Sequence, residues 1–145
     1  MKLIKYIFLF STGLISAVNM EAQTSTVHIY DLTPGSYIDS LAAYPEMVQL
    51  NVNFKIENVN QADSAFFMLG TAPNTADIAN VTGIFRLVNG NSFVEINTNQ
   101  YPVINDEASC QVILSKSQLD LSKYLSMFVK DLQGNISNSL NIRIN

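Results

Sequence analysis

The segment Met47–Glu57 constrains the fold of this chain more than any other. It reads MVQLNVNFKIE, so five apolar side chains alternate without a break with five polar ones. Successive side chains of a β-strand point to opposite faces of a sheet, and this pattern therefore predicts a strand with one face on a core and the other in water. A slip of one residue would turn all five apolar side chains outward, so we expect the register of this strand to be firmly set.

Shorter runs of strand character occur along the rest of the chain. We expect Thr24–Leu32 to be a first, edge strand that ends at Thr33-Pro34-Gly35-Ser36, because Pro and Gly interrupt strands. The turn residues Asn89-Gly90-Asn91 predict a hairpin between two of the later runs, because this kind of turn needs positive φ angles. The other predicted strands are Ser64–Thr71, Gly83–Val88, Ser92–Asn97, Ala108–Leu114 and the two strands of the last hairpin.

The segments between these runs read as connections. Asn58–Asp63, Pro73–Asn80 and Asn99–Glu107 are polar or contain Pro, and we expect loops there. Ser117–Tyr124 is expected to form a short helical turn capped by Ser117. None of the connections is a helix long enough to cross between parallel strands, and this favours antiparallel pairing.

About seven or eight short strands separated by turn signals predict an all-β fold, most simply an antiparallel sandwich. An eight-stranded barrel is the main alternative. The chain of 145 residues is 48% hydrophobic and only 14% charged, which is typical of a packed domain. We expect residues 23–145 to form a single domain of this kind.

The last hairpin carries a resemblance to a known family. Leu125–Lys130 alternates, Asp131-Leu132-Gln133-Gly134-Asn135 has turn chemistry, and alternation resumes at Ser139–Ile144. The apolar strand, the pattern Asp131-x-x-Gly134-Asn135-x-Ser137 and the final strand together resemble the last hairpin of fibronectin type III-like and immunoglobulin-like domains of exported bacterial proteins. The resemblance covers about the last fifth of the chain. It implies a β-sandwich and no particular activity, because that family has none in common.

The N-terminus has the features of a secretory signal peptide, residues 1–22. Lys2 and Lys5 precede the apolar run Tyr6–Val18, which suits a signal sequence and is short for a membrane span. We expect cleavage after Ala22, and an uncleaved anchor is the alternative. The mature chain is then exported to the periplasm, the cell surface or the medium, with no membrane span of its own.

The net charge of the whole chain is −4, and two of its eight basic residues lie in the predicted signal peptide. Nucleic acids and anionic membrane surfaces are bound through patches of Lys and Arg. The sequence therefore predicts neither a nucleic-acid partner nor a membrane surface as the target.

The residues that most enzymes require are scarce. His28 is the only histidine and Cys110 the only cysteine, and no nucleophile signature surrounds either of them. We expect His28 on the surface and Cys110 as a small buried side chain. A single cysteine also leaves the chain without an internal disulfide. The carboxylates are scattered, apart from the adjacent pair Asp106-Glu107, so we expect no enzymatic activity.

No cofactor is expected, and the chain has candidate residues for two kinds of ligand. Asp131 and Asn135 are the candidate ligands for Ca²⁺, although turn formation also explains them and no EF-hand pattern is present. One histidine and one cysteine cannot close a zinc site. Glycans favour aromatic platforms, and Tyr37, Tyr44 and Tyr101 are the candidates because the chain has no Trp. The adjacent Phe66 and Phe67 must lie on opposite faces of their strand.

Two functions follow from these features. The first is an exported, non-enzymatic β-sandwich that acts as a protein-interaction or structural module at the cell envelope, with another envelope or secreted protein as partner. The alternative is a small-molecule or glycan-binding domain that uses loop tyrosines and carboxylates. Partner contacts are expected in the loops of a sandwich, here Thr33–Glu46, Asn58–Asp63, Pro73–Thr82 and Asn99–Glu107.

Overall fold

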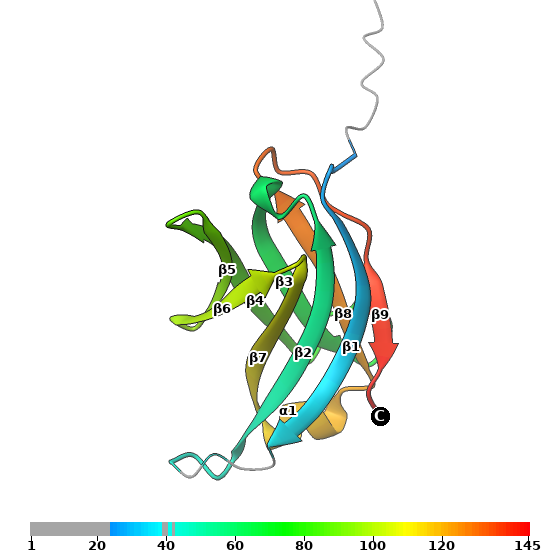
Figure 1. Ribbon diagram of the computed structural model, residues 1–145. Helices are drawn as coiled ribbons and strands as arrows, with labels where there is room; N and C mark the ends of the chain where they lie inside the picture. Colours follow the sequence, from blue (N-terminus) through cyan, green and yellow to red (C-terminus); the bar gives the residue numbers. More distant parts are fainter. Residues whose placement is uncertain (1–23, 39–40, 42) are drawn as a thin grey trace, which may run out of the picture.

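The computed structural model describes residues 24–38, 41 and 43–145, and it is almost entirely antiparallel β-structure (Figure 1). The all-β prediction is confirmed. The predicted signal peptide, residues 1–22, lies outside the described residues. The elements are β1 (His28–Ile38), β2 (Met47–Glu57), the 3-10 turn η1 (Val59–Gln61), β3 (Ala62–Gly70), β4 (Ala79–Val88), β5 (Asn91–Ile96), β6 (Asn99–Ile104), β7 (Glu107–Ser115), α1 (Lys116–Leu121), β8 (Tyr124–Asp131) and β9 (Leu140–Arg143).

The nine strands form one sheet in the order β1-β2-β7-β6-β5-β4-β3-β8-β9. The sheet curls until it is nearly barrel-shaped, and β6 joins its two halves. The expected immunoglobulin-like sandwich of seven or eight strands is therefore not confirmed. The two hairpins that end in Asn89-Gly90 and Asn97-Thr98 project away from the body of the molecule (Figure 1).

The core lies between the two halves of the sheet and is built from alternating strand positions. Strand β2 follows its predicted pattern: Val48, Leu50, Val52, Phe54 and Ile56 are all at most 3% exposed. Strand β7 belongs to the same layer as β2, and strands β3 and β8 contribute the facing layer, with the same alternation of buried side chains. The rings of Phe54 and Phe67 meet across the core with their centroids 6.0 Å apart. Burial of these side chains is the main stabilising term of such a fold.

Strands β1 and β9 stand at the two ends of the strand order but lie side by side in space (Figure 1). Among the described residues, no backbone hydrogen bond joins these two strands. The side chain of Asn138 bridges this seam instead. Its Oδ1 accepts a hydrogen bond from the Ile29 N–H at 2.9 Å, and its Nδ2 donates one to the Ile29 carbonyl at 2.7 Å.

Three local predictions were wrong. Strand β1 runs on through Pro34-Gly35, because register shifts on both sides of Thr33-Pro34 absorb the irregularity at an edge strand. The predicted connection Asn99–Glu107 contains strand β6, which is held between two tight turns with positive φ angles. The helical turn after β7 is capped by Ser115 and not by Ser117; Ser115 and Gln118 form a capping box.

Candidate functional site

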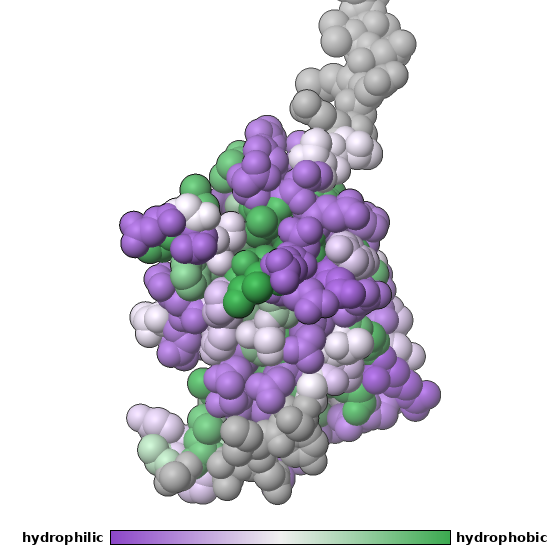
Figure 2. Space-filling model, in the orientation of Figure 1, coloured by the Kyte–Doolittle hydropathy of each residue, from purple (hydrophilic) through white to green (hydrophobic). Residues whose placement is uncertain are grey.

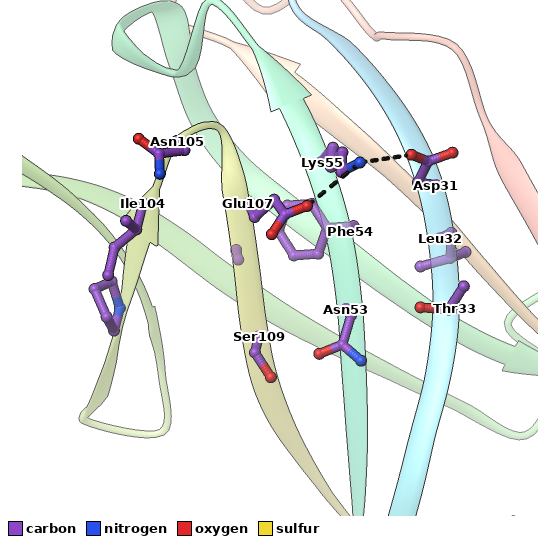
Figure 3. Close-up of a pocket in the computed structure, with 12 residues that line it drawn as sticks. Asp31, Leu32, Thr33, Asn53, Phe54, Lys55, Ile104, Asn105, Glu107 and Ser109 are labelled. Carbon is purple, nitrogen blue, oxygen red and sulfur yellow. Dashed lines mark hydrogen bonds and ion pairs between the residues drawn. The ribbon is translucent and has the colours of Figure 1, made fainter.

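A groove of about 900 Å³ lies on the outer side of β1, β2 and β7. The end of β6 pairs with the start of β7 there, and β6 then turns away from β7, so β6 forms one wall of the groove (Figure 3). The lining residues are Asp31, Leu32, Thr33, Asn53, Phe54, Lys55, Pro102, Ile104, Asn105, Glu107, Ala108 and Ser109.

A three-residue ion cluster occupies the groove. The Nζ atom of Lys55 lies 3.0 Å from Oδ2 of Asp31 and 3.3 Å from Oε1 of Glu107 (Figure 3). The two carboxylate side chains are each 62% exposed, so they remain open to a partner. Hydrogen bonds from Lys55 to Asp31 and then to Glu107 raise the pKa of the lysine, which is therefore held in its charged form.

Backbone geometry brings these three residues together. Lys55 and Glu107 are register partners on β2 and β7, and Tyr30 is the register partner of Lys55 on β1. Asp31 follows Tyr30 with a φ of 53°, at the first register shift of β1. A bulge of this kind re-aims a side chain. Here Asp31 points toward Lys55, whose Nζ also lies 5.8 Å from the centre of the Tyr30 ring.

The β6 wall of the groove adds apolar surface. Ile104 is the register partner of Glu107 and is 63% exposed, and Pro102 lines the groove from the same strand. Figure 2 shows this face of the molecule as mainly hydrophilic, with small apolar patches where the projecting hairpins join the body. The groove thus offers an exposed ion cluster beside an exposed aliphatic side chain.

The residues that were weighed for catalysis do not meet in this groove. His28 is exposed on β1, as expected, and its ring stacks on Tyr30 with centroids 6.4 Å apart. Cys110 is fully buried in the core, and burial raises the pKa of its thiol to about 12. The thiolate is the reactive form of cysteine, so the folded chain holds Cys110 in its unreactive form.

The three tyrosines that were candidates for glycan binding lie apart. Tyr37 is on β1, opposite Leu50, and Tyr44 is 60% exposed next to its bridge partner Leu41. Tyr101 is on β6, where its hydroxyl donates a 3.5 Å hydrogen bond to the Gln111 carbonyl. Burial is the main cause of the raised pKa of Tyr101. Neither Tyr44 nor Tyr101 lines the groove.

The two candidate calcium ligands, Asp131 and Asn135, do come together, in the turn that follows β8. Oδ1 of Asp131 accepts hydrogen bonds from the N–H groups of Gln133 and Asn135, at 3.0 and 2.8 Å. Oδ2 accepts a third from the side-chain amide of Asn135 at 3.3 Å. The Asp131 carboxylate therefore uses its oxygens to accept the hydrogen bonds that shape this turn. In residues 24–38, 41 and 43–145, no group of three or more His, Cys, Asp or Glu side chains is placed to hold a metal ion.

Sequence reasoning missed Lys55 as a functional residue, treated Asp31 as an isolated carboxylate, and paired Glu107 only with its neighbour Asp106. The signal that would find them is the pairing register, since a cation on β2 with an acid opposite it on β7 forms a cross-strand pair. That register depends on which strands are neighbours, and one sequence does not state this.

Comparison with protein-family models, with curated proteins and with solved structures finds no match to this chain. None of the helices in the described part of the chain has the length and apolar character needed to cross a membrane.

Proposed function

We propose that this chain is an exported, non-enzymatic β-domain that acts as a protein-interaction or structural module at the cell envelope. Another envelope or secreted protein is its partner. The observation that carries this proposal is the groove, which joins the exposed ion cluster Asp31–Lys55–Glu107 to the exposed side chain of Ile104. Exposed charges beside an aliphatic contact suit a protein surface, because charges orient a partner and apolar area supplies affinity.

Two further parts of the proposal rest on the sequence. Residues 1–22 are proposed to be a signal peptide, because two lysines precede a short apolar run. The fold is proposed to be related to fibronectin type III-like and immunoglobulin-like sandwiches. The support for this relation is the β8–β9 hairpin with its Asp131–Asn135 turn, together with the contact of the tilted Phe54 and Phe67 rings across the core.

A pull-down by cross-linking tests the protein-interaction proposal. The tagged chain Gln23–Asn145 is recovered from envelope and culture fractions of its own host, as wild type and as two charge-reversal variants. Glu107→Lys reverses a groove carboxylate. Glu57→Lys makes the same change at an exposed position of β2 that does not line the groove. We expect a recurrent protein partner that Glu107→Lys loses and Glu57→Lys retains.

Two other outcomes of this pull-down would contradict the proposal. A partner that binds both variants as well as wild type would place the contact elsewhere and overturn the role of the groove. Absence of any recurrent protein partner would overturn the interaction proposal itself. The variants are compared only after circular dichroism shows that both are folded like wild type.

Glycan binding is the second candidate function, and one observation favours it. The groove presents the side chains of Thr33, Asn53 and Ser109 from three neighbouring strands next to two carboxylates. Amides, hydroxyls and carboxylates are the groups that hydrogen-bond to sugar hydroxyls. Retention of wild type, but not of Asn53→Ala, on cell-wall polysaccharide in the same pull-down would favour this second function.

A further inference from the structure

On the side away from β2, strand β7 has a paired neighbour only at its start. Strand β6 pairs with β7 only through Val103–Ala108 and Ile104–Glu107, and then turns away to pair with β5. Figure 1 shows β6 crossing only the upper end of β7. On its other side, β7 keeps nine consecutive register pairs with β2. Strand β7 is thus a regular strand that is paired fully on one side only.

Hydrogen bonds identify which residues face the open side. Alternate residues of an antiparallel strand direct both their N–H and C=O groups to the same neighbour. The Gln111 carbonyl accepts from the Tyr101 hydroxyl, and the Ser115 N–H donates to Oε1 of Gln118 at 3.0 Å. Both contacts are away from β2. By alternation, Ser109, Gln111 and Ile113 face the open edge, and the Tyr101 contact is the one hydrogen bond to their outward backbone groups in the described part of the chain.

The other two edges of the sheet are protected against further pairing, whereas on the open edge of β7 the 3.5 Å contact of the Tyr101 hydroxyl with the Gln111 carbonyl is the one obstacle that the described residues place at Ser109–Ile113. Strand β1 contains Pro34 and two register shifts. The side chain of Asn138 also forms hydrogen bonds with both backbone groups of Ile29. Strand β9 is four residues long. Proline, bulges and short length are the usual protections of an edge strand. The stretch Ser109–Ile113 has no proline, no charged residue and no register shift.

We propose that β7 pairs with β7 of a second copy of this chain, as an antiparallel two-fold dimer. An antiparallel pairing of one strand with itself is self-complementary under a two-fold axis. In the register that places Gln111 opposite Ile113, no charged side chains meet in the ladder. The Glu107 end of one strand then faces the Lys116 end of the other, so the charges at the two ends are of opposite sign. Pairing stops at two copies because the edges of β1 and β9 are protected.

This inference goes beyond the proposed function and does not depend on it. The ladder is short, so the dimer is expected to dissociate on dilution. The test is sedimentation velocity of Gln23–Asn145 over a wide concentration range, together with hydrogen exchange of the Gln111 and Ile113 amides. We expect the mass to double with concentration, and we expect these two amides to exchange more slowly at high concentration than at low.

Ile113→Lys is the decisive variant, since its partly exposed side chain can place a charge in water without disturbing the core. In the dimer, two copies of the new positive charge would lie close together at the paired edge and repel each other. The dissociation constant of the dimer should therefore rise by about tenfold or more. Thr82→Lys adds the same charge at an exposed site on β4 and should leave the dimer intact. Ile113→Pro removes the outward N–H and should abolish pairing as well.

Three results would overturn the proposal: a monomer at every soluble concentration, a dimer unaffected by either Ile113 variant, and equal loss of the dimer in Thr82→Lys. Slower exchange of Gln111 and Ile113 that appears only with a different captured protein would assign the edge to that protein instead. Far-UV circular dichroism of each variant confirms folding, and the exchange experiment uses wild type alone.

Discussion

At the scale of single residues, Asn138 does for Ile29 what a neighbouring strand does elsewhere in the sheet. It accepts from the Ile29 N–H and donates to the Ile29 carbonyl, with both distances below 3 Å. A side-chain amide carries an acceptor and a donor on one planar group, whereas a carboxylate carries acceptors only. The identity of this residue as asparagine is therefore a structural requirement.

Replacing Asn138 by Asp should lower the free energy of unfolding by about 2 kcal/mol at pH 7, because a carboxylate oxygen would face the Ile29 carbonyl with no donor between them. Urea unfolding measures this difference. Asn141→Asp is the matched control, because Oδ1 of Asn141 only accepts, from the Asn74 N–H at 3.1 Å, and Asp keeps that acceptor. A change of less than about 0.5 kcal/mol is expected there. Equal losses in the two variants would contradict the role of Asn138.

At the scale of elements, the turn after β8 depends on one ionised carboxylate. Asp131 is only 2% exposed. Burial raises the pKa of its carboxyl, but hydrogen bonds from the Asn135 N–H, from Ser25 and from the side chain of Asn135 outweigh burial, and the net shift is downward. The folded state therefore holds Asp131 in its charged form more firmly than the unfolded chain does.

The sign of this pKa shift predicts a pH dependence of stability. A pKa that is lower in the folded state gives stability that is full above the unfolded value of about 3.9. That stability is lost as the pH falls through the folded-state pKa. Asp131→Asn should thus be less stable than wild type at pH 7, and the difference should shrink in acid. Urea unfolding at both pH values checks this, with the exposed Asp120→Asn as control. A difference that does not change with pH would contradict the assignment.

The elements that were predicted well are those whose signal is local. Met47–Glu57 is β2 residue for residue, and the turn at Asn89-Gly90 joins β4 to β5 with φ angles of 50° and 79°. The final hairpin is also present. Strand β6 was missed because Pro102 and a polar start hide it, and its pairing is shared between β5 and β7. The groove was missed because its parts meet only through the strand order.

At the scale of the whole molecule, two adjacent phenylalanines have different tasks. Phe67 is fully buried and meets Phe54 across the core, so it links the two halves of the sheet. Phe66 points to the other face, as predicted, and its ring stacks on Phe128 with centroids 4.7 Å apart. Phe66 keeps part of its surface in water. The core contact, and not the outer aromatic pair, holds the two halves together.

Truncation of the two side chains should therefore have unequal effects. Phe67→Ala should lower the free energy of unfolding by about 4 kcal/mol, through lost burial and a cavity. Phe66→Ala should cost about 1–2 kcal/mol, the loss of a partly exposed stacking contact. Chemical unfolding of both variants measures the two values. An equal or larger loss for Phe66→Ala would show that the outer face contributes as much as the core.

The seam between β1 and β9 also governs the order in which the fold can be completed. Ile29 and Asn138 are 109 positions apart, so the contact that fastens the first strand needs a residue near the end of the chain. Contacts of such large sequence separation are slow to form. A ribosome delivers the chain from the N-terminus, so β1 must wait, with its edge open, until Asn138 has emerged. Completion of this fold consequently waits for the segment that follows β8.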